Sequence, residues 1–186
     1  MMNIKKIIQI VHYVIAKYKY RINYTKLIKL LYLADRQALA ETGTSITGDT
    51  YYAMANGPVL STLYDLIRGK GSDDMKIMWN SVFAKDGYDI YALSENISYG
   101  ELSEYEEKVL DDIDEKYHNM PYTKMINLVH NKEICPEWNK PVNGAKLIKP
   151  ESILLFSGWS DEDINIWKEE NQIFEEEEKI LNGLES

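Results

Sequence analysis

The sequence is poor in cysteine, with Cys135 as the single thiol among 186 residues. One cysteine cannot close an internal disulfide, so a disulfide-stapled fold is excluded and a reducing compartment, the cytoplasm, is expected. The chain also lacks a run of roughly 18 uncharged apolar residues, which a membrane-spanning helix needs. The apolar stretch 7–16 follows two lysines as in a secretion signal, but Gln9 and His12 interrupt it and no small-residue cleavage site follows. We therefore interpret it as an ordinary helix, with no membrane partner.

Basic residues are outnumbered, with 21 Lys and Arg against 30 Asp and Glu, a net charge of −9. This charge repels a phosphate backbone, and no Lys/Arg-dense run offsets it, so a nucleic-acid partner is not expected. The charge is uneven, however. Residues 1–50 carry eight cations and three acids, whereas residues 161–186 carry ten acids and two lysines. The two ends therefore either attract each other or face different partners.

Residue types that hold metals or perform catalysis are sparse and scattered. The three histidines, His12, His118 and His130, lie far apart, and no glycine-rich phosphate loop, nucleophile elbow or metal-ligand spacing occurs. No metal, cofactor or catalytic residue is predicted. A Cys135–His130 pair leaves a small hydrolase as a less favoured alternative, because no helix N-terminus or adjacent base lies beside Cys135 in the sequence to lower its pKa. A DNA-binding autoregulator is weaker still, since no basic recognition helix is evident.

Apolar residues make up 45% of the chain, enough to bury a core, and many follow helical spacing. Asn3 is placed to cap a first helix, and a second runs from about Thr25 to a stop at Gly43. Ser103 and Glu106 form a capping-box pattern that opens another helix. A short helix is expected at about residues 122–130.

The remaining segments predict a small amount of sheet. Residues 49–56 favour an extended strand, and residues 82–93 predict a hairpin with its turn at Lys85-Asp86-Gly87. Pro58 predicts the first turn of a helix that ends at Gly69. Residues 131–150 are expected to be irregular, with Trp138 as an anchor in the core. The expected fold is mainly α (α+β), a compact helical domain with a small antiparallel β-hairpin or sheet and a long C-terminal helix.

That last helix is predicted from an N-cap at Ser160 to about Leu181 and is strongly acidic. Within it, apolar residues recur at intervals of seven, which predicts a narrow seam for one neighbouring helix. They are Ile166, Ile173 and Ile180, with Trp167, Phe174 and Leu181 beside them. The seam either packs back on the body or binds a partner. We divide the chain into a domain over 1–150 and an acidic helical extension over 151–186.

Several short motifs occur in order along the first part of the chain. They are KLIKLLYLA at 26–34, Gly48-Asp49, Tyr52-Ala53, Asn56-Gly57-Pro58-Val59 with Tyr64, Leu102-Ser103 before Glu106 and Leu110, Leu128-Val129-His130, and Trp138. Over roughly residues 3–150 they resemble the Panacea domain of the SocA-like antitoxin family. Eight positions separate His130 from Trp138, more than is usual in that family.

The resemblance implies a bacterial antitoxin, often encoded in a prophage or mobile element, that binds a cognate protein toxin rather than acting as an enzyme. It also implies an alternative, an adaptor that delivers the toxin to a cytoplasmic protease. The toxin itself is not identified by family membership.

Candidate partner-binding residues lie in the motif region and in the acidic helix. They are Tyr51, Tyr52, Asn56, Gly57, Pro58, Tyr64, Trp167 and Phe174. Tyrosine supplies rigid amphipathic area at interfaces, although the same residues can serve as half-buried core. Strand alternation predicts that Tyr51 is more exposed than Tyr52. Gly57-Pro58 has a structural reading as a turn and helix start, beside its reading as a partner-binding loop.

Overall fold

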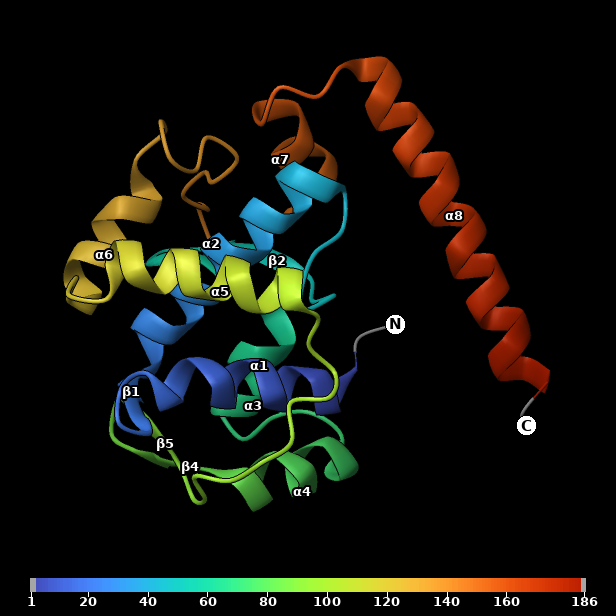
Figure 1. Cartoon of the computed structure of the whole chain (residues 1–186). Coiled ribbons are helices and arrows are strands. Elements are labelled where there is room, and N and C mark those ends of the chain that lie inside the picture. The colour runs from blue at the N-terminus through green and yellow to red at the C-terminus, as the bar shows by residue number, and fades with distance from the viewer. Residues whose placement is uncertain (1–2, 185–186) are drawn as a thin grey trace.

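The computed structural model describes residues 3–184, which form eight helices and two three-stranded antiparallel sheets (Figure 1). In chain order the elements are α1 (Ile4–Ala16), β1 (Arg21–Asn23), α2 (Tyr24–Thr42), β2 (Tyr51–Met54), β3 (Gly57–Leu60), α3 (Ser61–Ile67), α4 (Asp73–Val82), β4 (Phe83–Asp86), β5 (Asp89–Ala92), α5 (Glu104–Tyr117), α6 (Tyr122–His130), β6 (Lys146–Ile148), α7 (Pro150–Phe156) and α8 (Asp161–Leu184). The predicted fold class, a mainly helical α+β domain with small antiparallel sheets and a long last helix, is confirmed.

Helix α2 is the centre of the core. It packs against α1, α5, α6, α7 and β3, and in Figure 1 the yellow-green α5 crosses in front of it. The Asn23 side chain caps its N-terminus by accepting from the amides of Thr25 and Lys26, and Gly43 ends it in a left-handed conformation, φ 74°. Because neighbours surround α2, it buries residues all round, including Lys26, Lys29 and Asp35.

The two sheets have the strand orders β1-β5-β4 and β3-β2-β6. The hairpin predicted at 82–93 is confirmed, and Gly87, at φ 58°, starts the two-residue turn that joins β4 to β5. Strand β6 was not predicted. Its three residues lie in the segment expected to be irregular, and they pair with residues 51–53 of β2.

The prediction that Pro58 begins a helix is wrong. Pro58 lies in β3, opposite Ala53 of β2, and the helix begins only at Ser61. Proline is tolerated here because β3 is an edge strand of its sheet. The start of α3 is fixed from a distance, since the Asp49 carboxylate accepts from the amides of Thr62 and Leu63.

Local caps account for most other helix starts. Asn3 accepts from the amides of Lys5 and Lys6, as predicted. Both halves of the capping box between Ser103 and Glu106 are present. Ser160 accepts from the Asp163 amide and opens α8. Each cap satisfies amides that the first turn of a helix leaves without partners.

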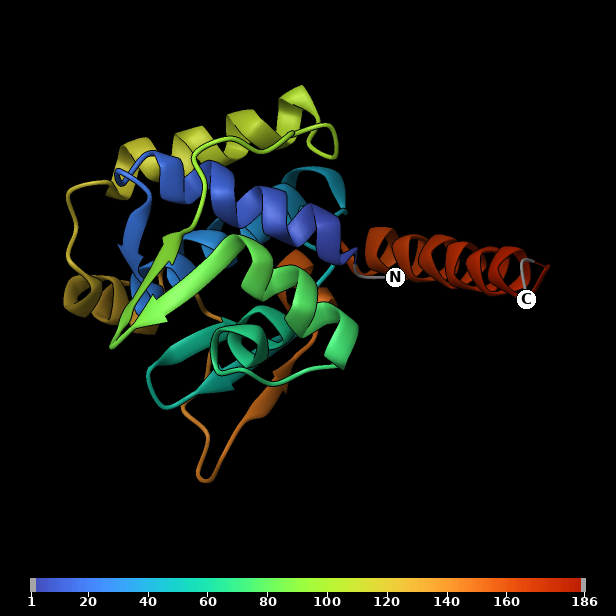
Figure 2. The ribbon, with the colours of Figure 1, turned by 90° about the horizontal axis from the view of Figure 1, so that it is seen from below.

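Helix α8 leaves the body after its first turns, as the red ribbon shows in both Figure 1 and Figure 2. Its contact with the body includes Ile164, which is buried, and Trp167. No helix within residues 3–184 is long and apolar enough to cross a membrane.

The cations of the N-terminal half are paired mainly with acids outside α8. Lys6 lies 2.6 Å from Glu106 and Lys17 lies 2.6 Å from Asp111, both on α5. Arg36 of α2 pairs with Glu137 at 2.9 Å. Within residues 3–184, these three cations therefore pair with acids of α5 and of the 131–145 segment, while α8 contacts the body through Ile164 and Trp167.

Candidate functional site

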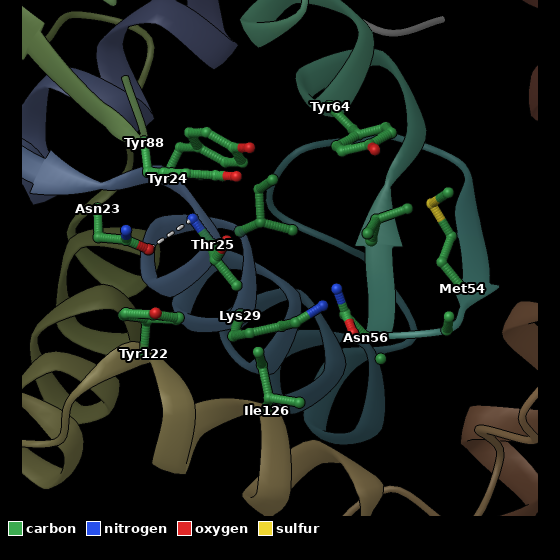
Figure 3. A pocket seen from close by; sticks show the side chains of 14 residues that line it. Asn23, Tyr24, Thr25, Lys29, Met54, Asn56, Tyr64, Tyr88, Tyr122 and Ile126 are labelled. Carbon is green, nitrogen blue, oxygen red and sulfur yellow. Dashed lines mark hydrogen bonds between the residues drawn. The ribbon is translucent and has the colours of Figure 1, made fainter. Parts of the chain in front are cut away.

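A cavity of about 460 Å³ opens where the start of α2, the β2–β3 hairpin, α3, the β4–β5 turn and α6 meet (Figure 3). Its lining residues are Asn23, Tyr24, Thr25, Ile28, Lys29, Met54, Ala55, Asn56, Gly57, Val59, Tyr64, Tyr88, Tyr122 and Ile126. Four of them are tyrosines, each from a different part of the chain. The volume falls in the range of small-ligand and side-chain pockets.

Lys29 reaches this cavity from the second turn of the buried α2 and is 2% exposed. Its ammonium donates to the Pro58 carbonyl over 2.6 Å. Burial lowers the pKa of Lys29 to about 7, and the nearby Cys135 partly opposes that shift. Figure 3 shows the ammonium pointing toward the β2–β3 turn that carries Asn56.

Gly57 is required where β3 passes over Lys29. Its φ is +102°, and a Cβ added there would lie 2.6 Å from Val129 Cγ2 and 3.2 Å from Lys29 Nζ. Only glycine combines this backbone conformation with such close approach. The Asn56-Gly57-Pro58 motif is therefore the element that seats the hairpin on α2 and α6.

We expect Gly57→Ala to destabilise the chain by about 1 to 3 kcal/mol more than Gly87→Ala. Gly87 also has positive φ, but a Cβ added there would meet no atom of residues 3–184 within 4 Å, so Gly87→Ala measures the backbone strain without the clash. Urea unfolding of both variants measures the difference. Equal losses for the two variants would show that the hairpin does not need its close approach to Lys29 and Val129.

The rim of the cavity is aromatic. Tyr88 and Tyr122 are 72% and 45% exposed, and Tyr24 and Tyr64 are half-buried. The guanidinium of Arg68 lies 5.1 Å from the Tyr64 ring centre, and the Lys85 ammonium lies 5.6 Å from that of Tyr24. Two cations thus lie beside two of the rim tyrosines.

The structure separates the predicted partner-binding residues of the motif region. Asn56 and Tyr64 line the cavity with Gly57, whereas Pro58 is buried beneath it. The expected order of the two strand tyrosines is wrong. Tyr51 is 2% exposed and Tyr52 is half-buried. Tyr51 packs edge-on against Tyr32, and its hydroxyl donates to Asp35, so this face of β2 looks into the core.

Trp167 and Phe174 lie far from the cavity and have different environments. The Trp167 indole donates to the Gly43 carbonyl over 2.7 Å and so fixes α8 to the end of α2. Phe174 is 69% exposed, and Ile166, Ile173 and Ile180 are at least half exposed. The seam therefore packs on the body at Trp167 and is open beyond it. Leu181 has a side chain outside the described part of α8.

His130 and Trp138 meet despite their separation in sequence. Their rings stack at 4.0 Å and 10°, and the Trp138 indole donates to the Met54 carbonyl over 3.2 Å. The longer intervening segment is absorbed by a turn in which the Cys135 amide bonds to the Asn131 carbonyl. Trp138 is buried, as predicted, and it holds the end of β2 beside the cavity.

Cys135 is in an environment that suits packing rather than nucleophilic chemistry. It is fully buried, and burial, with a contribution from Glu137, raises the pKa of its thiol to about 12. At neutral pH it is a thiol, not the thiolate that attacks substrates. Across residues 3–184, no group of three or more His, Cys, Asp or Glu side chains could hold a metal ion.

Sequence reasoning missed Lys29, Tyr88 and Tyr122 as members of the site. The sequence pattern could have identified Lys29, because this lysine interrupts a run of apolar residues on a helix predicted to be deeply buried. Tyr88 and Tyr122 had none, since only the tertiary fold brings the β4–β5 turn and α6 to the same cavity.

A family model described as "Antitoxin SocA-like, Panacea domain" matches residues 27–139. This span contains α2 from Leu27 onward, the β2–β3 hairpin, α5, α6 and Trp138. Neither the curated proteins nor the solved structures gave a match.

Proposed function

The chain belongs to the SocA-like Panacea-domain antitoxin family, and from this premise we propose that it is the antitoxin of a toxin–antitoxin pair. It neutralises a cognate protein toxin by direct binding, in the cytoplasm, without catalysis. The family match over 113 of 186 residues carries the proposal. The buried, protonated thiol of Cys135 supports it by removing the nucleophile that the hydrolase alternative needs.

We further propose that the open part of α8 is one of the toxin-binding surfaces. Ile166, Ile173 and Phe174 are exposed on one side of a helix that extends from the body. Glu170 and Glu177 are also exposed and lie between successive apolar pairs on the same side. Such a surface suits a partner groove with apolar pockets and basic residues between them.

The decisive experiment concerns the product of the neighbouring gene. We expect it to arrest growth when expressed alone, to permit growth when this chain is co-expressed, and to be recovered with the chain in a pull-down. Association should weaken as salt concentration rises, because the chain carries a net charge of −9. Arrest that persists with the chain present at equal or greater abundance would refute the proposal.

Replacing both Ile173 and Phe174 by serine is expected to weaken toxin binding at least about tenfold, the effect of losing one or two exposed anchors. Stability should change by less than about 0.5 kcal/mol, since both side chains face solvent. Asn165→Ser with Gln172→Ser, two exposed polar positions on the opposite side of α8, is the matched control. Calorimetric titration with the toxin and thermal unfolding give the two readouts. Equal affinities for the two double variants would exclude this part of α8 from the interface.

The protease-adaptor alternative differs in the fate of the toxin. Co-expression in a host that lacks the protease separates the two mechanisms: neutralisation that survives the deletion supports sequestration. If instead the toxin accumulates in that host and again arrests growth, the chain acts by delivering the toxin to the protease and not by sequestration. In either case we propose that residues 1–150 form the family domain and residues 151–186 adapt it to its own partner.

A further inference from the structure

Lys29 is the one charged side chain among the residues that line the 460 Å³ cavity. This is unusual in a chain with 30 acids and a net charge of −9. The remaining lining is made of tyrosines, aliphatic side chains, Asn23, Asn56 and Thr25. The cavity is therefore a locally positive, aromatic-walled site on an acidic protein.

The ammonium of Lys29 has unused bonding capacity. It has three N–H donors, and within residues 3–184 the Pro58 carbonyl is its one hydrogen-bond acceptor. No carboxylate in that part of the chain lies within 4.0 Å of it. The groups whose charges couple to that of Lys29 are the Cys135 thiol and the His130 imidazole, neither of which supplies a negative charge at neutral pH. A buried ammonium without a counter-ion is energetically unfavourable.

We propose that this cavity binds a carboxylate carried beside an aromatic or aliphatic group, with the carboxylate on Lys29 and the apolar group against Tyr24, Tyr88 and Tyr122. The bound carboxylate supplies the counter-ion that Lys29 lacks. The tyrosine rim supplies contact area for the neighbouring group, and the exposed Asn56 amide can donate to the same carboxylate or to an adjacent carbonyl.

The site favours a carboxylate over a phosphate. Phosphate sites in proteins combine several donors, commonly arginines or a run of backbone amides at a helix N-terminus. Here one ammonium forms the floor, and the nearest arginine, Arg68, is directed at the Tyr64 hydroxyl on the rim. One cation in an aromatic pocket matches the single charge of a carboxylate.

The carboxylate comes from a peptide segment of the toxin, which presents either an acidic side chain or its C-terminal carboxylate. In naming the toxin as this source, the proposal rests on the proposed function. The two sources share the same chemistry. An extended segment can reach the cavity because the cavity is open at Tyr88, Tyr122 and Asn56, all of which are exposed.

The first test uses N-acetyl-phenylalanine as the probe, because it carries one carboxylate beside one aromatic ring. Titration into the full chain, followed by the ¹³Cε resonance of Lys29, should give a saturable shift and a rise in the Lys29 pKa. The uncharged probe N-acetyl-phenylalaninamide should bind at least about tenfold more weakly, the effect of one charge-assisted contact. N-acetyl-glutamic acid α-amide tests a side-chain carboxylate in the same way. Equal binding of the acid and the amide, or no binding of either acid, would overturn the proposal.

Two variants test whether the probe binds in this cavity at Lys29. Lys29→Met removes the cation, and Ile126→Glu introduces an internal carboxylate beside Lys29, as Figure 3 shows for these two side chains. Both variants should lose binding of the acid probe. Because Lys29→Met lacks the lysine resonance, binding to this variant is followed by the resonances of the cavity tyrosines. Circular dichroism reports whether each variant remains folded. Undiminished binding by a folded variant contradicts the assignment. The two variants act by different routes, so a fold defect in one leaves the other to decide.

Neutralisation of the toxin by the two variants tests this inference separately from the antitoxin function on which it rests. If the wild-type chain neutralises the toxin, both variants should neutralise it less well. Full neutralisation by both variants overturns the assignment of the cavity to the toxin, although the antitoxin function stands. Failure of the wild-type chain to neutralise refutes the antitoxin function and, with it, the toxin as the source of the carboxylate. The probe titration still decides whether the cavity binds carboxylates.

Discussion

Replacing Glu137 by alanine is expected to reduce the free energy of unfolding by about 2 to 4 kcal/mol, the range for removing one member of a buried ion pair. Its Oε1 accepts from the Tyr32 hydroxyl over 2.7 Å and from Arg36 Nε over 2.9 Å. The Glu137 side chain is fully buried, and that of Arg36 is 19% exposed. Alanine would leave a guanidinium and a hydroxyl of α2 without an acceptor inside the core.

The same carboxylate explains why the loss should not exceed this range. Its second oxygen, Oε2, is buried and has no hydrogen-bond partner among the residues that the structure describes, so the native interaction already contains one unfavourable contribution. Arg36 can also turn part of its side chain toward solvent once the pair is broken. Removal of the unpaired Oε2 and exposure of Arg36 to water therefore partly offset the loss of the acceptor for Tyr32 and Arg36.

Chemical denaturation of Glu137→Ala and Glu137→Gln tests this reasoning. Glutamine keeps the acceptor for Tyr32 and Arg36 and removes the charge, so it should lose less than alanine. Glu133→Ala, at an exposed position four residues earlier in the chain, is the control and should change little. A loss below about 1 kcal/mol for Glu137→Ala would mean that Arg36 and Tyr32 find other partners at little cost.

The sequence was sufficient where a local pattern determines the structure. Asn3, Ser103 with Glu106, and Ser160 each cap a helix through contacts within a few residues, and each was predicted. The 82–93 hairpin follows for the same reason, because its turn residues impose the reversal.

Prediction from the sequence failed where a residue distant in the chain determines the local structure. Pro58 suits the start of a helix by itself, yet pairing with β2 keeps it in a strand, and Asp49 caps the helix three residues later. Tyr51 and Tyr52 are correctly placed in a strand, but alternation alone does not say which side meets the core. That choice depends on α2, where Tyr32 and Asp35 contact Tyr51.

The candidate site was predicted in part for a related reason. Of the partner-binding candidates, Asn56, Gly57 and Tyr64 line the cavity, and their role in binding stays a prediction. Lys29 escaped because an amphipathic helix is assumed to turn its lysines to solvent. Helix α2 is surrounded on all sides, so this assumption does not hold for it.

Replacing Lys29 by methionine is expected to stabilise the free chain by about 1 to 3 kcal/mol at pH 6, although it removes the hydrogen bond to Pro58. Methionine has a similar length and flexibility and no charge to desolvate. Stability is measured by urea unfolding at pH 6 and pH 9. Lys124→Met, at an exposed position on α6, is the control and should be nearly neutral.

The advantage of methionine should shrink as pH rises. The pKa of Lys29 is lowered to about 7 in the folded chain, from an ordinary value of 10.5. Between these two values the unfolded chain binds a proton that the folded chain has released. Wild-type stability therefore rises with pH in this window, by up to about 1.4 kcal/mol per unit from this group. The Cys135 and His130 groups that face Lys29 are present in both proteins, so their titration largely cancels in the difference.

A difference that stays constant from pH 6 to pH 9 would show that Lys29 has an ordinary pKa and no desolvation penalty. The expected result has a wider consequence. A lysine that lowers stability in the free chain, and for which methionine would pack as well, has no explanation in the fold alone. Functional residues commonly have this property, because the interaction that compensates them arises only on binding. Binding of a carboxylate should then stabilise the wild-type chain and leave Lys29→Met unchanged.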